Sequence, residues 1–170
     1  MRVLMIIGKD YDDEEGIYPF YRLLEAGVDV DVASFEKEPV LAKYHAKINA
    51  NLNFSEVDAD LYDGLVLPGG KAPEKLRLND DVLKITEKIF RAGKPVAAIC
   101  HGQQILISAD VLRGKKATSY PGIRKDMENA GAMYLDQPVV IDENLITSRR
   151  PEDLPYFMRA YMDLLEAQEK

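Results

Sequence analysis

The sequence is short of cysteine and of long apolar runs, and both shortages exclude whole classes of protein. One cysteine in 170 residues cannot form an internal disulfide and supplies too few thiols for a structural zinc site. The longest apolar runs, Val3–Ile7 and Pro95–Cys100, are far shorter than the roughly 20 residues that cross a bilayer. Because Met1-Arg2 leads directly into the first run without a leader pattern, we expect a cytoplasmic protein with no membrane partner.

Positive charge, histidine and phosphate-binding motifs are also scarce. The chain has 22 Lys and Arg against 29 Asp and Glu, a formal net charge of −7, whereas a nucleic-acid backbone selects clustered Lys and Arg. It contains no G-x-G-x-x-G or G-K-[ST] motif, so we expect no nucleic acid, no cofactor and no metal as ligands. His45 and His101 are the only histidines, which excludes the triad of a glutamine amidotransferase; His45 is expected to be solvated or structural.

What the sequence does contain predicts one α/β domain over residues 1–170. Hydrophobic residues make up 46% of the chain, enough for a sizeable core in a single domain of this length. Short β-branched runs alternate with amphipathic stretches, which is typical of a three-layer sandwich with a parallel sheet and helices on both faces. Five strands are predicted, each apolar enough to be buried on both sides: Arg2–Ile7, Val28–Ser34, Gly64–Leu67, Pro95–Ile99 and Leu145–Ser148.

The remaining segments predict helices and an irregular sheet edge. Apolar periodicity indicates helices over Asp81–Ala92 and Glu152–Ala167. Loose alternation over Pro39–Phe54 predicts a small antiparallel excursion at the edge of the sheet, and Pro138–Ser148 predicts a hairpin. Since an open α/β sheet carries its chemistry at the carboxyl ends of its strands, the functional residues are expected in the loops that follow the strands.

The loop after the fourth predicted strand carries the only thiol. Cys100 follows Pro95–Ile99 and precedes an apolar helix, with the small residues Ala98 and Gly102 on either side, which is the pattern of a nucleophile elbow. A thiol at a helix start faces unpaired N–H groups, so we expect a lowered pKa and a strained backbone at Cys100. Residue type alone favours an inert buried cysteine, but Gly102 and the adjacent His101 favour the reactive reading.

Two further loops could complete such a site. Gly69 and Gly70 end the third strand, where their N–H groups can approach a reacting atom and form an oxyanion hole. In the first loop, Asp12 is a plausible helix N-cap with Glu15 as its capping-box partner. A protonated carboxyl beside the thiol would stabilise the thiolate, and spacing alone does not choose among five acidic residues: Asp10, Asp12, Asp13, Glu14 and Glu15.

Taken together, these residues resemble the PfpI (ThiJ/PfpI) family of intracellular proteases and deglycase-like proteins, from Val3 to Leu165. The resemblance implies a flavodoxin-like sheet. The segments that carry it are Glu15-Gly16-Ile17-Tyr18-Pro19, Val32-Ala33-Ser34-Phe35, Leu65-Val66-Leu67-Pro68-Gly69-Gly70, Pro95–Gly102, Thr118-Ser119-Tyr120-Pro121-Gly122-Ile123, Ser148-Arg149, Pro151 and Asp153-Leu154.

The resemblance also implies roles for individual residues. It assigns Glu15 as the hydrogen-bond partner of the nucleophile Cys100 and His101 as the histidine that follows it. The oxyanion hole would consist of main-chain N–H groups of Gly69, Gly70 and His101.

The same resemblance implies a subunit assembly. Glu74 stands where protease-like members complete a Cys-His-Glu triad from a neighbouring subunit, so a homo-oligomer is expected, a dimer or a larger assembly such as a trimer of dimers. The family usually has proline where this chain has Gln103, and we expect Gln103 and Tyr120 to line the substrate pocket.

Three functions remain open for this site. The leading one is a cysteine hydrolase of the intracellular peptidase type, with Cys100 as nucleophile, His101 as base or orienter and Glu15 as thiolate stabiliser. The family resemblance offers a glyoxalase or protein deglycase, acting on glyoxal-type aldehydes or their adducts, as the alternative. The third is a redox sensor or chaperone in which Cys100 oxidises and little turnover occurs.

Overall fold

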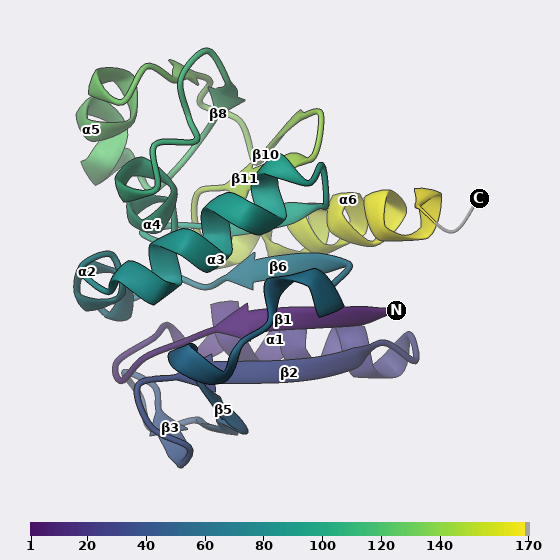
Figure 1. Cartoon of the computed structure of the whole chain (residues 1–170). Helices are drawn as coiled ribbons and strands as arrows, with labels where there is room; N and C mark the ends of the chain where they lie inside the picture. The colour runs from purple at the N-terminus through teal and green to yellow at the C-terminus, as the bar shows by residue number, and fades with distance from the viewer. Residues whose placement is uncertain (169–170) are drawn as a thin grey trace.

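The computed structural model describes residues 1–168 and places a seven-stranded sheet at the centre of the molecule (Figure 1). The strand order is β10-β11-β7-β6-β1-β2-β5, and every pair is parallel except β10 with β11. The strands of this sheet are β1 Arg2–Ile6, β2 Asp29–Ser34, β5 Leu52–Asn53, β6 Gly64–Leu67, β7 Val96–Ile99, β10 Val139–Asp142 and β11 Leu145–Ser148. All five predicted strands are therefore confirmed, as is the hairpin of β10 and β11.

Helices cover both faces of this sheet. In Figure 1, α1 and α6 lie behind it and α3 lies in front of it, while α2 and α4 lie near the carboxyl ends of the strands. The parallel strands are accordingly buried on both sides, with β6, β7 and β11 buried throughout. The helices are α1 Asp13–Glu25, α2 Ala72–Leu76, α3 Asp80–Arg91, α4 Gln103–Ser108, α5 Arg124–Asn129 and α6 Leu154–Ala167. The predicted flavodoxin-like three-layer sandwich is confirmed.

Two helices show how the sequence sets their limits. Asn79 caps α3 by accepting the N–H groups of Asp81 and Val82, and the predicted apolar face of this helix is buried. A 3-10 turn, Pro151–Asp153, precedes α6, so this helix starts two residues later than predicted. Among the described residues, no helix is long and apolar enough to span a membrane.

The edge of the sheet carries the predicted antiparallel excursion. Pro39–Leu41 (β3) and Lys47–Asn49 (β4) form a separate hairpin beside β2 and β5 (Figure 1). A second small sheet, the parallel pair of Lys116–Ala117 (β8) and Met133–Tyr134 (β9), is not predicted from the sequence. Strands of two residues are too short to show an alternating pattern.

Candidate active site

The turn after β7 has the strained geometry of a nucleophile elbow. Cys100 has a φ of 64°, in the left-handed region that a non-glycine residue rarely adopts, which confirms the expected strain. Two main-chain hydrogen bonds hold it there: its N–H donates to the Ser148 carbonyl at 3.1 Å, and its carbonyl accepts the Tyr120 N–H at 3.2 Å. Gly102 is required next to it, because a Cβ would lie 2.3 Å from the Leu67 carbonyl oxygen.

Glu15 is the acidic residue that the first loop sends into the interior. Asp12 caps α1 by accepting the Glu15 N–H at 3.2 Å, which confirms the predicted cap. The reciprocal half of the capping box is not formed, since the Glu15 side chain is fully buried and its Oε1 accepts the Gly69 N–H at 3.1 Å. The other four acidic residues of the loop are at least partly exposed, so the structure chooses Glu15.

Burial keeps this carboxyl protonated at neutral pH. It raises the pKa of Glu15 to about 9, and the charge of Asp12 acts in the same direction. Hydrogen bonding to Gly69 and contact with Cys100 oppose the increase. Oε2 has no hydrogen-bond partner in the described part of the chain, so the acid proton is free to face the sulfur.

The expected low pKa of Cys100 is wrong in direction. Burial, together with the charge of a nearby Glu15 carboxylate, raises the pKa of the Cys100 thiol to about 12. Main-chain N–H groups of His101 and Gly70 hydrogen-bond the sulfur and act against that rise. The helix start favours a lower pKa, but desolvation of the thiol, which the sequence does not reveal, outweighs it. Because Glu15 is protonated at neutral pH, its charge is absent there and burial remains as the main cause.

His101 is placed to receive the thiol proton. Its Nδ1 lies 3.3 Å from the Cys100 Sγ, and its ring stacks on the Tyr120 ring with centroids 4.8 Å apart at 29°. Burial and the charge of Lys43 lower the pKa of His101 below its ordinary value of 6.5, while Glu74 opposes this. The imidazole is therefore neutral at neutral pH and can act as a base.

Only one glycine of the pair has its N–H group placed as expected for an oxyanion hole. The Gly69 N–H is already used by Glu15, so Gly69 is not an oxyanion donor. Gly70, with a φ of 85°, and His101 supply the N–H groups that face the sulfur. Gly69 instead provides space, since a Cβ there would lie 2.6 Å from Glu15 Oε1 and 2.8 Å from Cys100 Cβ.

The other expected site residues lie in three different environments. Tyr120 is 43% exposed, and its ring stacks on the His101 ring. Gln103 is fully buried behind the elbow, so its expected place in the substrate pocket is wrong. Glu74 is exposed on α2, with no side-chain hydrogen bond to residues 1–168, and His45 is exposed on the β3–β4 turn.

Lys43 is a residue near the site that the sequence analysis missed. It lies on the β3–β4 turn, and its Nζ is 3.4 Å from Asp12 Oδ2. Its charge lowers the pKa of both Glu15 and His101. No local signal marks it, because a lone lysine in a turn is usually solvated. Among the described residues, no three His, Cys, Asp or Glu side chains could hold a metal ion together.

A strained cysteine elbow on a flavodoxin-like sheet, with a buried acid and two main-chain N–H groups facing the sulfur, defines a cysteine-centred site of the DJ-1 and PfpI type. The sequence profile of the DJ-1/PfpI family matches residues 1–164, and the chain belongs to that family. The resemblance seen in the sequence is thereby confirmed over nearly the whole chain.

Individual relatives agree with this assignment. "Deglycase PfpI" of Pyrococcus furiosus is 50% identical over 166 residues, which cover 98% of this chain and 100% of that protein. "Putative cysteine protease YraA" of Bacillus subtilis is 39% identical over 97% of this chain and 98% of its own length. The crystal structure of Drosophila melanogaster DJ-1beta superposes with a TM-score of 0.89 at 30% identity, covering 96% of this chain and 90% of that one.

Proposed function

We propose that this protein is a cysteine-dependent deglycase that acts on glyoxal-type adducts of amines or thiols, and on the free aldehydes. The observation that carries the proposal is the Cys100 sulfur, which lies 3.3 Å from a neutral imidazole and faces the N–H groups of Gly70 and His101. Such donors stabilise the oxygen of a carbonyl under attack. Several relatives named deglycases, Pyrococcus furiosus PfpI among them, favour this substrate class over the peptidase reading, which is the second candidate.

The geometry suggests the order of the first step. As sulfur adds to the carbonyl carbon, the thiol proton passes to His101 Nδ1, a carbon–sulfur bond forms and the carbonyl electron pair moves to oxygen. The N–H groups of Gly70 and His101 then face the new oxyanion. Glu15 holds its own proton at neutral pH, so it places no charge beside the sulfur and can donate to the sulfur or the oxyanion.

Side-by-side turnover assays test the proposal. Purified protein is incubated separately with a methylglyoxal-modified amine, with free methylglyoxal and with a fluorogenic peptide. Release of the 2-hydroxy acid is measured for the first two substrates, and release of the fluorophore for the peptide. We expect Cys100→Ser and His101→Ala to lose turnover of the adduct, whereas His45→Ala, a change of the exposed histidine, retains it. Full turnover by Cys100→Ser would refute the nucleophile assignment, and cleavage of the peptide alone would favour the peptidase.

We also propose that a second copy of the chain completes the site. Glu74 is exposed on α2, and its charge acts on His101 of its own chain without a hydrogen bond within residues 1–168. A groove of about 980 Å³ between α1 and the start of α6 contains Tyr18, Tyr21 and Leu24, which are 41 to 59% exposed; its lining does not include Cys100. Exposed apolar surface of this kind marks association sites. A strictly monomeric protein in light scattering would refute this.

A further inference from the structure

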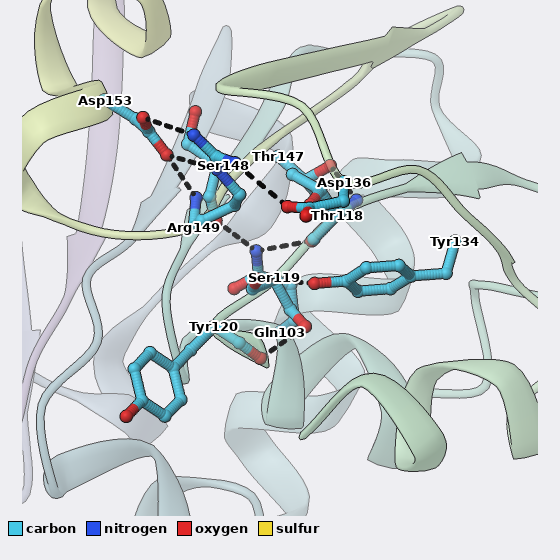
Figure 2. A network of polar contacts seen from close by, with 10 residues as sticks. All are labelled: Gln103, Thr118, Ser119, Tyr120, Tyr134, Asp136, Thr147, Ser148, Arg149 and Asp153. Atoms are coloured by element: carbon cyan, nitrogen blue, oxygen red, sulfur yellow. Dashed lines mark hydrogen bonds and ion pairs between the residues drawn. The ribbon is translucent and has the colours of Figure 1, made fainter. Parts of the chain in front are cut away.

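A buried polar network lies directly behind the elbow, and Gln103 is its centre (Figure 2). The Gln103 Nε2 donates to the Thr118 carbonyl and to the Ser148 carbonyl, each at 2.8 Å. An amide –NH2 has two hydrogens, and both are used here. Because two acceptors face one atom, an oxygen in that place would be repelled by both carbonyls. The amide orientation of Gln103 is thus fixed by its surroundings.

One of these two carbonyls also orients the nucleophile. The Ser148 carbonyl accepts the Cys100 N–H as well as the Gln103 amide, so both donors converge on one oxygen at the end of β11. The next residue is held firmly: Arg149 bonds Asp153 and Asp136, each at 2.9 Å (Figure 2). The Ser148 carbonyl oxygen that accepts the Cys100 N–H is therefore positioned by the Gln103 amide and by the ion pairs of the next residue, Arg149.

The other carbonyl belongs to the loop that carries Tyr120. Residues 118–120 are attached to the elbow side at two points, through the Gln103 amide and through the Tyr120 N–H on the Cys100 carbonyl. On the far side, Thr147 and Tyr134 hold the same loop by bonds at 2.9 Å to its main chain (Figure 2). Without the Gln103 bond, Thr147 and Tyr134 would still hold the loop on its far side, but the loop would be less firmly held on the side that faces Cys100.

We propose that Gln103 is a positioning residue of the active site, which holds the Tyr120 ring against His101 and the Ser148 carbonyl against the Cys100 N–H. The Tyr120 ring covers one face of the imidazole, with centroids 4.8 Å apart. The family usually has proline at this position, whereas this chain has a glutamine that acts on the site through Tyr120. The proposal rests on the proposed function for its catalytic consequence, but its geometric content is measurable without turnover.

Gln103→Met is the main test, with Gln104→Met as its matched control. Methionine keeps the length of the side chain and removes both donors, whereas Gln104, the next residue, makes no side-chain hydrogen bond to residues 1–168. We expect kcat of Gln103→Met to fall roughly tenfold or more with KM nearly unchanged, because the His101 base is displaced from the sulfur. Gln104→Met should stay within about twofold of the parent.

Proton NMR of the two histidines separates positioning from mere stability. A His45→Ala variant identifies the His101 signals, because the chain has no other histidine. Burial lowers the pKa of His101, so loosening Tyr120 should move that pKa up toward its ordinary value of 6.5 in Gln103→Met and leave it unchanged in Gln104→Met. A variant that only loses stability would show a lower Tm with an unchanged His101 titration, and that result overturns the proposal.

A double variant checks that the effect passes through Tyr120. In a Tyr120→Leu background, Gln103→Met should no longer shift the His101 titration; an undiminished shift would overturn the proposed route. If Gln103→Met does not fold, Gln103→Glu replaces it, since a protonated carboxyl restores one of the two donors and should give an intermediate shift. Absence of turnover in the parent protein would refute the proposed function and leave these titrations to decide the role of Gln103.

Discussion

Replacing Glu15 by glutamine should make the protein more stable at neutral pH while it removes the acid of the site. The substitution keeps a side-chain oxygen for the Gly69 N–H and abolishes the titration. In the folded protein the pKa of Glu15 is raised from 4.5 to about 9. Between these two values the unfolded chain has released the proton and the folded chain still holds it. The stability linked to this group is thus full below pH 4.5 and is lost as the pH rises toward about 9.

The size of the effect follows from the width of that window. Each pH unit inside it reduces the free energy of unfolding by about 1.4 kcal/mol, so the loss from pH 4.5 to about 7 is roughly 3 kcal/mol. Glu15→Gln does not lose this free energy, because its side chain does not titrate. The other titratable groups are common to both proteins and cancel in the difference.

Urea unfolding followed by circular dichroism, at fixed ionic strength from pH 4.5 upward, measures this difference. We expect the free energy of unfolding of Glu15→Gln, relative to the parent, to rise with pH over the whole range. Glu14→Gln, a change of an exposed carboxylate in the same helix turn, is the matched control. A difference between Glu15→Gln and the parent that stays flat with pH would show that Glu15 is ionised in the folded protein, and the assignment of its proton would be wrong.

Three other predictions concern the neighbours of Glu15. Gly69→Ala should lower the free energy of unfolding by about 1–3 kcal/mol, measured by urea unfolding, and abolish turnover, because the new methyl group would press on Glu15 and Cys100. Turnover in the parent should fall as the pH drops through a value below 6.5, since His101 must be neutral to accept a proton; an NMR titration of His101 whose midpoint differs from the midpoint of this acid limb would exclude this cause. The redox-sensor hypothesis requires that mild peroxide adds oxygen to Cys100 ahead of the 6 methionines, although burial raises the pKa of this thiol; mass spectrometry that finds selective methionine oxidation would remove the hypothesis.

The sheet and the elbow could be predicted because their signals are local. Each predicted strand is an apolar run of four or more residues that the fold buries on both faces, so pattern and burial agree. The strain at Cys100 follows from a strand that must turn at once into a helix, and Gly102 reveals it because only glycine fits against the Leu67 carbonyl. The signals for the strand, the turn and the helix start all lie in one short stretch of consecutive residues.

The rest depends on contacts between distant residues, and there the sequence misleads. Glu15 and Gly69 are 54 positions apart, so nothing local indicates that the Gly69 N–H donates to the Glu15 carboxyl oxygen and is not available to an oxyanion hole. Gln103 looks like a pocket residue because it follows Cys100-His101-Gly102, yet its side chain turns inward to carbonyls 15 and 45 positions away. The pKa of Cys100 depends on desolvation, which only the packed structure determines.

Neighbouring acidic residues of the first loop have different structural roles. Asp12 caps α1 and pairs with Lys43, while Asp13 accepts the N–H groups of Tyr44 and Ala46 at 2.8 and 2.9 Å and so fastens the β3–β4 turn. That fastening is what brings the Lys43 charge to the site. The charge of Asp12 raises the pKa of Glu15, and the charge of Lys43 lowers it less than burial raises it. The loop therefore places an acid that is uncharged at neutral pH next to Cys100, and the charges of Asp12 and Lys43 act on the pKa of that acid in opposite directions.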